Sequence, residues 1–354
     1  MPTISTSYAT IGTLAKQLKA QGKPRYARCL ETLIRAGDVL DMFPIMKCNQ
    51  GTVHRFSRRK SIGKGGVWRA LNQGVPLSMP ETEEATEIAG SLEDRCDLDK
   101  KALTLNDNSS AFIENQNEGV RIALRNRLND AVIYGNRAAP GDAAGIDGLA
   151  TRYNALGKVV NANTQYDHVQ DFGGTGNALT SVYLLAPGVQ SLYLINADNG
   201  CPAGLSIEEY DSRNGVFLED TEGLPFRGHR TWYEWPLGLA VENIHSVMRL
   251  ANIPSTDVAN LIANGVTSPS DSMLLRKMIE MKNMVSADVD KSKLLFLVSR
   301  DVFTTMDILM FEKANAYWTP SNLERDLPPR SVGMFAGLPV FMSDTLIGTE
   351  SQVV

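Results

Sequence analysis

The pattern that comes closest to a ligand-binding motif in this chain is a lysine among glycines, Gly63-Lys64-Gly65-Gly66. A phosphate-binding loop requires the order GxxxxGK[ST], because its backbone N–H groups surround the phosphates while the lysine contacts the outer ones. That order does not occur here. We therefore expect no nucleotide site, and we interpret these glycines as a turn.

Residues that bind metals or act as nucleophiles are spread too widely to predict a site. The histidines form no HExxH motif and no pair at metal-ligand spacing: His54, His168, His229 and His245. The cysteines form no CxxC pair, and we interpret them as reduced, mostly buried thiols: Cys29, Cys48, Cys96 and Cys201. No metal or cofactor is predicted.

Acidic side chains in turn-like sequence are the remaining candidates for catalysis. Asp198, Asp211 and Asp220 lie there, where a solvated or turn-capping aspartate is the ordinary explanation. The chain has no GxSxG nucleophile elbow. A cytosolic enzyme with an unrecognised site around Asp198–Asp220 stays open as an alternative, but no catalytic residue is predicted.

The composition indicates a globular protein made of two or three structural units. The chain has 354 residues, of which 43% are hydrophobic and 21% charged, enough to bury a sizeable core. No apolar run is long enough to cross a bilayer and no secretory signal opens the sequence, so a cytosolic protein is expected. The net charge of -5 argues against a surface devoted to nucleic acid.

The elements that would position any site begin with a basic N-terminal segment. Residues 1–36 carry six cations and one acid. Two short amphipathic helices are expected, broken at Gly22-Lys23-Pro24, and their apolar stripes include these residues: Leu14, Leu18, Leu30 and Leu33. These stripes need an apolar surface to lie on, supplied either by their own chain or by a neighbouring subunit. Because they precede the core, we expect the neighbouring subunit to supply it and the helices to add little to the fold of their own subunit.

Two adjacent segments have opposite charge. Residues 47–80 contain no acid, and residues 81–99 are rich in Asp and Glu. The glycines at 63–66, flanked by Val53, Phe56, Val67 and Trp68, predict a long β-hairpin. The basic and acidic segments could be the two arms of one hairpin, with their charges pairing within the chain as exposed cross-strand pairs, or the basic tip could contact another copy.

A long helix is predicted from Asp107 to Gly135, with serines as N-caps and a Gly-Asn stop. Apolar residues recur on one stripe: Ile113, Val120, Leu124, Leu128, Ala131 and Val132. The opposite face carries polar residues and is expected to be wet: Asn117, Arg121, Arg125, Asn129 and Asp130. We interpret this helix as a one-sided strut; an ordinary long surface helix packed on a sheet is the alternative.

The rest of the chain predicts mixed α and β structure without the regular alternation of strands and helices that βαβ units show. Residues 177–253 are strand-rich, and the caps and periods of residues 255–264, 272–285 and 301–315 predict helices. Short apolar runs at 294–298 and 337–342 predict buried strands.

Several short sequences in the strand-rich region together resemble major capsid proteins from a branch of short-tailed bacteriophages. They are Tyr183-Leu184-Leu185-Ala186-Pro187-Gly188, Leu192-Tyr193-Leu194-Ile195 with Ala203-Gly204-Leu205, Asp220 to Gly223, Phe226-Arg227-Gly228-His229-Arg230-Thr231, Trp235-Pro236-Leu237-Gly238-Leu239-Ala240-Val241, and Arg249-Leu250-Ala251-Asn252-Ile253. The closing Phe335-Ala336-Gly337-Leu338-Pro339-Val340 with Ser343-Asp344 is similar to the C-terminal strand of those proteins.

This resemblance implies an α+β major capsid fold of the Hong Kong 97 type (HK97-like). It assigns 1–44 to an N-terminal arm, 45–90 to an extended β-hairpin loop, and 91–170 to a peripheral domain with the spine helix at 107–135. The resemblance also implies that residues 171–354 make up the axial domain, with part of 226–253 expected to return to the peripheral domain.

The implied function is structural: a major capsid protein of a tailed dsDNA phage that self-assembles into hexamers and pentamers of an icosahedral shell. The intersubunit contact would involve the charged loop: Arg55, Arg58, Arg59, Lys60, Lys64, Trp68, Arg69, Glu81, Glu83, Glu84 and Glu87. Lys16, Lys19 and Lys23 are candidates for the interior face near packaged DNA, and the solvated face of a short helix is the alternative reading of them. A cellular nanocompartment shell of the same fold is the second structural reading.

Partners beyond the subunit itself would be scaffolding, portal and cement proteins, together with weak, non-specific contact with packaged dsDNA and no membrane. The location would be the virion, with assembly in the host cytoplasm.

Overall fold

A computed structural model of the chain describes residues 10–34, 39–61, 66–105, 109–140, 144–157, 167–197, 199–201, 204–211, 217–219, 221–264, 273–286, 289–312, 318–320 and 332–354. The chain divides into two compact units. Unit 1 comprises residues 1–54, 88–149 and 194–239, and unit 2 comprises residues 55–87, 150–193 and 240–354. The predicted division into arm, loop, peripheral domain and axial domain stays a prediction.

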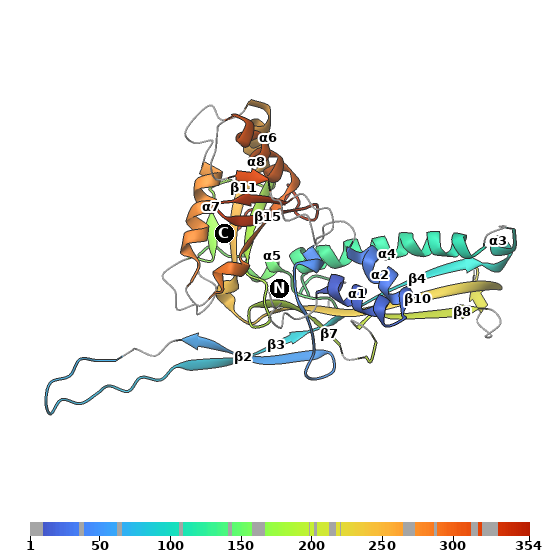
Figure 1. Cartoon of the computed structure of the whole chain (residues 1–354), viewed down its shortest axis with the longest axis horizontal. Coiled ribbons are helices and arrows are strands. Elements are labelled where there is room, and N and C mark those ends of the chain that lie inside the picture. Colours follow the sequence, from blue (N-terminus) through green and yellow to red (C-terminus); the bar gives the residue numbers. More distant parts are fainter. Residues whose placement is uncertain are drawn as a thin grey trace. The chain divides into compact units, whose positions relative to one another are not determined.

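Unit 1 is a sheet accompanied by a long helix. The strand order is β1 (Ile45–Lys47), β7 (Leu192–Asn196), β10 (Pro225–Val241) and β4 (Gly90–Asp99). β10 pairs antiparallel with β4 from Gly228↔Asp99 to Leu237↔Gly90, and also with β8 (Ser206–Asp211) and β9 (Phe217–Glu219). Helix α4 (Ser109–Tyr134) runs alongside β4 and β10 (Figure 1).

Helix α4 confirms the predicted strut in length, but the predicted wet face is wrong at three of its five residues, while Asp130 is exposed and Arg125 is half-buried. Asn117, Arg121 and Asn129 are all buried, at 3%, 6% and 2% exposure. The reason is that β10 and α2 both lie against this polar face. Asn117 Nδ2 donates to Thr231 Oγ1 of β10 at 3.3 Å, and Asn117 and Arg121 line a cavity together with residues of α2. A polar face that other elements cover is no longer the solvent face that the apolar–polar pattern predicts.

The two N-terminal helices are part of unit 1. In α1 (Ile11–Ala20) and α2 (Pro24–Ile34), Ile11, Leu18 and Leu30 are at most 6% exposed within the single chain. The expectation that these stripes need a neighbouring surface is therefore wrong for the described residues, because α1 packs on α2 and α2 on α4. The side chain of Leu33 lies outside the described residues.

Unit 2 is built on a seven-stranded sheet in the order β13-β14-β15-β12-β6-β11-β5. β6 (Leu179–Leu185) and β12 (Leu295–Ser299) are buried at every position, as is β11 (Val247–Pro254) except for its last residue. Helices α6, α7 and α8 lie beside this sheet (Figure 1). They confirm the predicted helices, at Ser255–Asn264, Met273–Met284 and Arg300–Glu312.

The remaining elements are short or belong to the hairpin treated below. They are β2 (Val53–Ser61), β3 (Glu81–Ile88), α3 (Lys100–Leu105), α5 (Leu149–Arg152), β5 (Val169–Asp171), β13 (Trp318–Pro320), β14 (Val332–Phe335), β15 (Leu338–Ser343) and the 3-10 turns Val39–Asp41, Ile244–Ser246 and Lys291–Lys293. No helix among the described residues is both long enough and apolar enough to span a membrane.

Candidate assembly surface

The first part of the candidate surface is the hairpin formed by β2 and β3, which pair as a two-stranded sheet. A second arm around Trp68 is wrong, because β2 pairs with 81–88; the reading in which the basic and acidic segments are the two arms of one hairpin is confirmed. Pro76 and Pro80 lack the backbone N–H that β-pairing requires, and Gly66 and Gly74 weaken a strand. The strand that pairs with β2 therefore begins only at Glu81.

Charges on the two arms pair within the chain. Arg58 Nε donates to Glu83 Oε1, and Arg55 Nη1 lies 3.9 Å from Glu84 Oε1. These cross-strand pairs follow the intrachain alternative for the charged segments. Pairs at this exposure contribute little to stability, so their role is to fix which residues face each other across the ribbon.

Glu87, near the end of β3, has a partner outside the ribbon. Its carboxylate accepts two hydrogen bonds from Arg152, with Nη2–Oε2 at 2.6 Å, and both groups are largely buried. Such bidentate guanidinium–carboxylate pairs are geometrically specific. Of the other loop residues predicted to make the intersubunit contact, Glu81 is exposed on β3, the side chains of Arg59 and Lys60 lie outside the described residues, and so does Lys64.

The second part is the stretch between the arms, residues 66–80, which we call the connecting segment. All fifteen residues are exposed, and they include six large apolar side chains: Val67 (49%), Trp68 (101%), Leu71 (94%), Val75 (65%), Leu77 (81%) and Met79 (71%). Contiguous exposed apolar side chains of this size mark an interaction surface in a soluble protein. The sequence analysis singled out the charges and Trp68 for this contact, but not the other exposed apolar side chains, which are also visible in the sequence.

A small turn gives the connecting segment local structure. Gln73 N donates to Ala70 O at 3.3 Å and Ala70 N donates to the Gln73 side chain at 3.1 Å, while Asn72 adopts a φ of 65°. Arg69 Nη1 donates to Gln73 O at 3.2 Å. Asn is among the residues that tolerate a left-handed backbone, so the turn is compatible with its sequence. Trp68 therefore precedes a hydrogen-bonded turn rather than lying in featureless chain.

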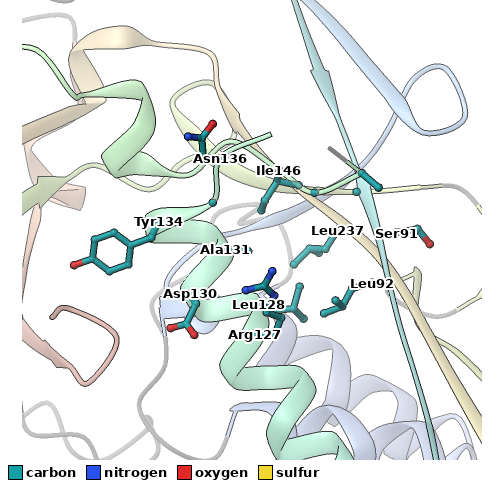
Figure 2. A pocket seen from close by; sticks show the side chains of 14 residues that line it. Ser91, Leu92, Arg127, Leu128, Asp130, Ala131, Tyr134, Asn136, Ile146 and Leu237 are labelled. Carbon is teal, nitrogen blue, oxygen red and sulfur yellow. The ribbon is translucent and has the colours of Figure 1, made fainter. Parts of the chain in front are cut away.

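A cavity of about 330 Å³ in unit 1 supplies a concave surface. It lies between the C-terminal half of α4 and the start of β4, closed by Leu237 of β10 and the turn at 144–146. Figure 2 shows Leu92, Leu128, Leu237 and Ile146 gathered around it, whereas Tyr134 and Asp130 point away at its edge. We call it the α4–β4 pocket.

Close backbone contact between the helix end and the turn shapes this pocket. A Cβ on Gly135 would lie 2.4 Å from the carbonyl oxygen of Ile146, and one on Gly90 would lie 2.7 Å from that of Ala144. Only glycine permits these approaches, so both positions require it. The Gly135-Asn136 stop found in the sequence thus also sets one wall of the pocket.

The edge of the pocket carries one acid and one base from α4, Asp130 and Arg127. Desolvation raises the pKa of the Asp130 carboxyl above its usual range, and the charge of Arg127 opposes that shift. A cation brought next to Asp130 would further favour its charged form.

The other predicted residues do not gather into a site. Lys16, Lys19 and Lys23 are exposed, with Lys19 Nζ 3.8 Å from Glu31. Asp198 and Asp220 lie outside the described residues, and Asp211 lies 3.7 Å from Lys100. Among the described residues no three His, Cys, Asp or Glu side chains are arranged to hold a metal ion.

A cluster in unit 1 joins residues that sequence reasoning treated separately. Cys29, Arg121 and Tyr233 line a second cavity of about 230 Å³, and Arg121 Nη2 donates to Glu114 Oε1 at 2.8 Å. Burial raises the pKa of both the Cys29 thiol and the Tyr233 phenol to about 12, although Arg121 opposes the shift in each. Neither group is ionised near neutral pH, so the cluster offers no activated nucleophile.

Comparison with known proteins assigns the chain to a family. Residues 21–354 match the family described as Major capsid protein GP7. A search of curated proteins finds no match. Among solved structures, the chain is similar to one of bacteriophage Epsilon15, with 21% identity, a TM-score of 0.58 and 87% of each chain covered. It is also similar to the capsid of bacteriophage JBD30, with 6% identity, a TM-score of 0.50 and coverage of 86% of this chain and 88% of the other.

These likenesses confirm the predicted fold class, because both aligned structures are phage shells of the HK97-like fold. The family match covers nearly the whole chain and describes a structural component, which excludes the enzyme alternative. The protein belongs to the major capsid protein GP7 family, and it is a structural capsid protein of a tailed phage that assembles into a multimeric virion shell.

Proposed function

We propose that this subunit forms the hexamers and pentamers of an icosahedral shell around double-stranded DNA, and that the β2–β3 hairpin makes the contact between subunits. The observation that supports this most strongly is the connecting segment, with six large apolar side chains in fifteen exposed residues. In a ring of identical subunits the contact is heterologous, so this segment meets a different surface on its neighbour. The hairpin charges, including Arg55, Arg58, Arg69, Glu81 and Glu84, set its register.

We further propose that the genome enters a preformed shell. The net charge of -5 leaves too few cations to draw in DNA by counterion release, which needs many neutralised phosphates. Lys16, Lys19 and Lys23 are exposed and are the proposed interior-facing residues, in weak and non-specific contact with DNA. Assembly takes place in the host cytoplasm, with scaffolding, portal and cement proteins as candidate partners.

Negative-stain microscopy of the purified subunit tests the shell directly. Closed shells or capsomer rings are expected, in equal number whether or not nuclease is added before assembly. Small monodisperse particles at every concentration would contradict the proposal. The cellular nanocompartment, which has the same fold, is separated by the contents of shells from the native source, since it would hold protein cargo in place of DNA.

Charge reversal in the hairpin tests the register. Arg58→Glu, Arg59→Glu and Lys60→Glu together remove the Arg58–Glu83 pair and reverse the basic arm. We expect a folded subunit, by circular dichroism and urea unfolding, that no longer forms shells. Adding Glu83→Arg to this variant restores one complementary pair and controls for damage to the ribbon itself. Normal shells from the triple variant at moderate salt would remove the hairpin charges from the contact.

A further inference from the structure

We infer that Trp68 of one subunit inserts into the α4–β4 pocket of a second copy of the chain. This inference rests on the proposed function, and it adds both the anchoring residue and its receptor.

Trp68 is the side chain in the described chain that most needs a partner. It is 101% exposed, while the three other tryptophans of the sequence lie in strands. Burying a large aromatic side chain such as an indole removes roughly 150–250 Å² of surface from water. Tryptophan is accordingly over-represented among the few residues that dominate protein interfaces. The turn that follows holds the backbone near Trp68 and lowers the entropy lost on docking.

The α4–β4 pocket has the size and lining for such an anchor. Its volume of about 330 Å³ is at the lower end for ligand pockets, enough for one or two side chains but not for a helix. Leu92, Leu128 and Leu237 supply apolar walls, as Figure 2 shows. Full exposure of Trp68 means that it does not occupy the pocket of its own chain.

Charge complementarity favours the same pairing. Arg69 is the one charged residue in the connecting segment and directly follows Trp68. Asp130 and Arg127 both lie at the edge of the pocket, and of these two charges the Asp130 carboxylate is the one that complements Arg69. With the indole inside, the Arg69 guanidinium is placed near this edge, where it would pair with the carboxylate.

Stoichiometry selects a second copy over an unrelated partner. Each chain carries both Trp68 and the α4–β4 pocket, so every subunit of a ring can insert its own Trp68 into one neighbour and accept the Trp68 of the other, and the ring closes. A cement protein bound in the pocket would instead leave the six apolar side chains of the connecting segment uncovered in the shell.

The first experiment compares Trp68→Ala with Leu105→Ala, which removes another exposed apolar side chain (80% exposed), in α3. Trp68→Ala should lower the yield of shells roughly tenfold or more, since an anchor of this kind commonly accounts for at least one decade in affinity. The urea midpoint of the subunit should not change. Leu105→Ala should leave both quantities unchanged. Normal shell yield from Trp68→Ala would overturn the inference.

The second experiment locates the receptor while keeping the anchor. Arg69→Cys and Asp130→Cys subunits, both with Cys201→Ser, are mixed, assembled and treated with a short bismaleimide; the other native cysteines are buried. A covalent dimer is expected. The matched control replaces Asp130→Cys with Asn115→Cys, an exposed position about 22 Å further along α4, and should not crosslink.

The outcomes separate the inference from the proposed function. Wild-type subunits that form no shell would contradict the proposed function itself. Shells that depend on Trp68 but crosslink at residue 115, or at neither position, would retain the hairpin as the interface and overturn the pocket as its receptor. Shells that form without Trp68 and take up a separate protein at the pocket would also overturn it.

Discussion

Unit 2 contains two irregular stretches that differ in burial: the connecting segment, residues 66–80, and the C-terminal residues 344–354. In the C-terminal stretch Leu346, Glu350 and Val353 are buried, at 5%, 6% and 7% exposure. Val353 exchanges two backbone hydrogen bonds with the side chain of Asn252, at 2.8 and 2.9 Å. In the connecting segment every residue is exposed. The lack of regular secondary structure therefore does not indicate whether a stretch is buried or exposed.

The difference lies in what each stretch offers to its own chain. Glu350 Oε2 accepts a hydrogen bond from Arg249 Nη2 at 2.9 Å and another from Ser181, and all three residues are buried. Arg249 also donates to the carbonyl oxygen of Tyr153 at 2.7 Å. The C-terminal stretch thus completes a buried polar network, which is costly to leave incomplete. The connecting segment carries apolar surface that its own chain does not cover. The favourable free energy of burying this surface is therefore gained only when subunits assemble.

The largest effect should follow from breaking the buried network. Glu350→Gln keeps the shape of the side chain but leaves the Arg249 charge unpaired. We expect a loss of about 3–5 kcal/mol in the free energy of unfolding, measured by urea denaturation of the subunit. Asp344→Asn is the matched control, because its partner Arg300 lies 2.7 Å away in a pair that is about two-thirds exposed, and it should cost less than about 1 kcal/mol. Equal losses in the two variants would refute the contrast.

A smaller effect is expected from alkaline pH. Burial raises the pKa of the Cys29 thiol from 9.0 to about 12, so in that range the unfolded chain loses this proton before the folded chain does. The contribution of the protonated thiol to the free energy of unfolding is fully present below about pH 9 and decreases as the pH rises toward about 12. By pH 10 about 1 kcal/mol of it is lost. The connecting segment has no group that titrates there. The urea midpoint measured in reductant should therefore fall between pH 8 and pH 10, less steeply in Cys29→Ala; a midpoint independent of pH would contradict this.

Regular periodicity made much of the fold predictable. The helix at 255–264, the strand at 295–299 and the helix at 300–312 lie within a few residues of the predicted ranges, because caps and apolar spacing are local properties. The burial of Asn117 and Arg121 was not predictable, since it depends on two elements distant in sequence packing on α4. Local pattern identifies a helix but not the number of its faces that are covered.

The candidate site divides in the same way. The basic and acidic arms of the hairpin were recognised because charge is visible in the sequence, whereas the pairing of β2 with β3 depends on which residues can continue a ladder. The α4–β4 pocket joins residues near 90, 130, 145 and 237, and no local pattern brings these together. Its traces in the sequence are Gly90 and Gly135, and a glycine at the end of a helix is explained equally well as a helix stop.

The smallest effect on folding should come from the connecting segment. Leu77→Ser with Met79→Ser replaces two side chains that are 81% and 71% exposed, so the free energy of unfolding should change by less than about 0.5 kcal/mol. Shell formation should nevertheless require a higher subunit concentration, because these side chains are buried only between copies. Light scattering across a concentration series measures that threshold, and urea unfolding of the same preparations measures the fold. A variant that unfolds more easily while assembling at the wild-type threshold would place these side chains in the interior of their own chain, and the contrast with the C-terminal stretch would be lost.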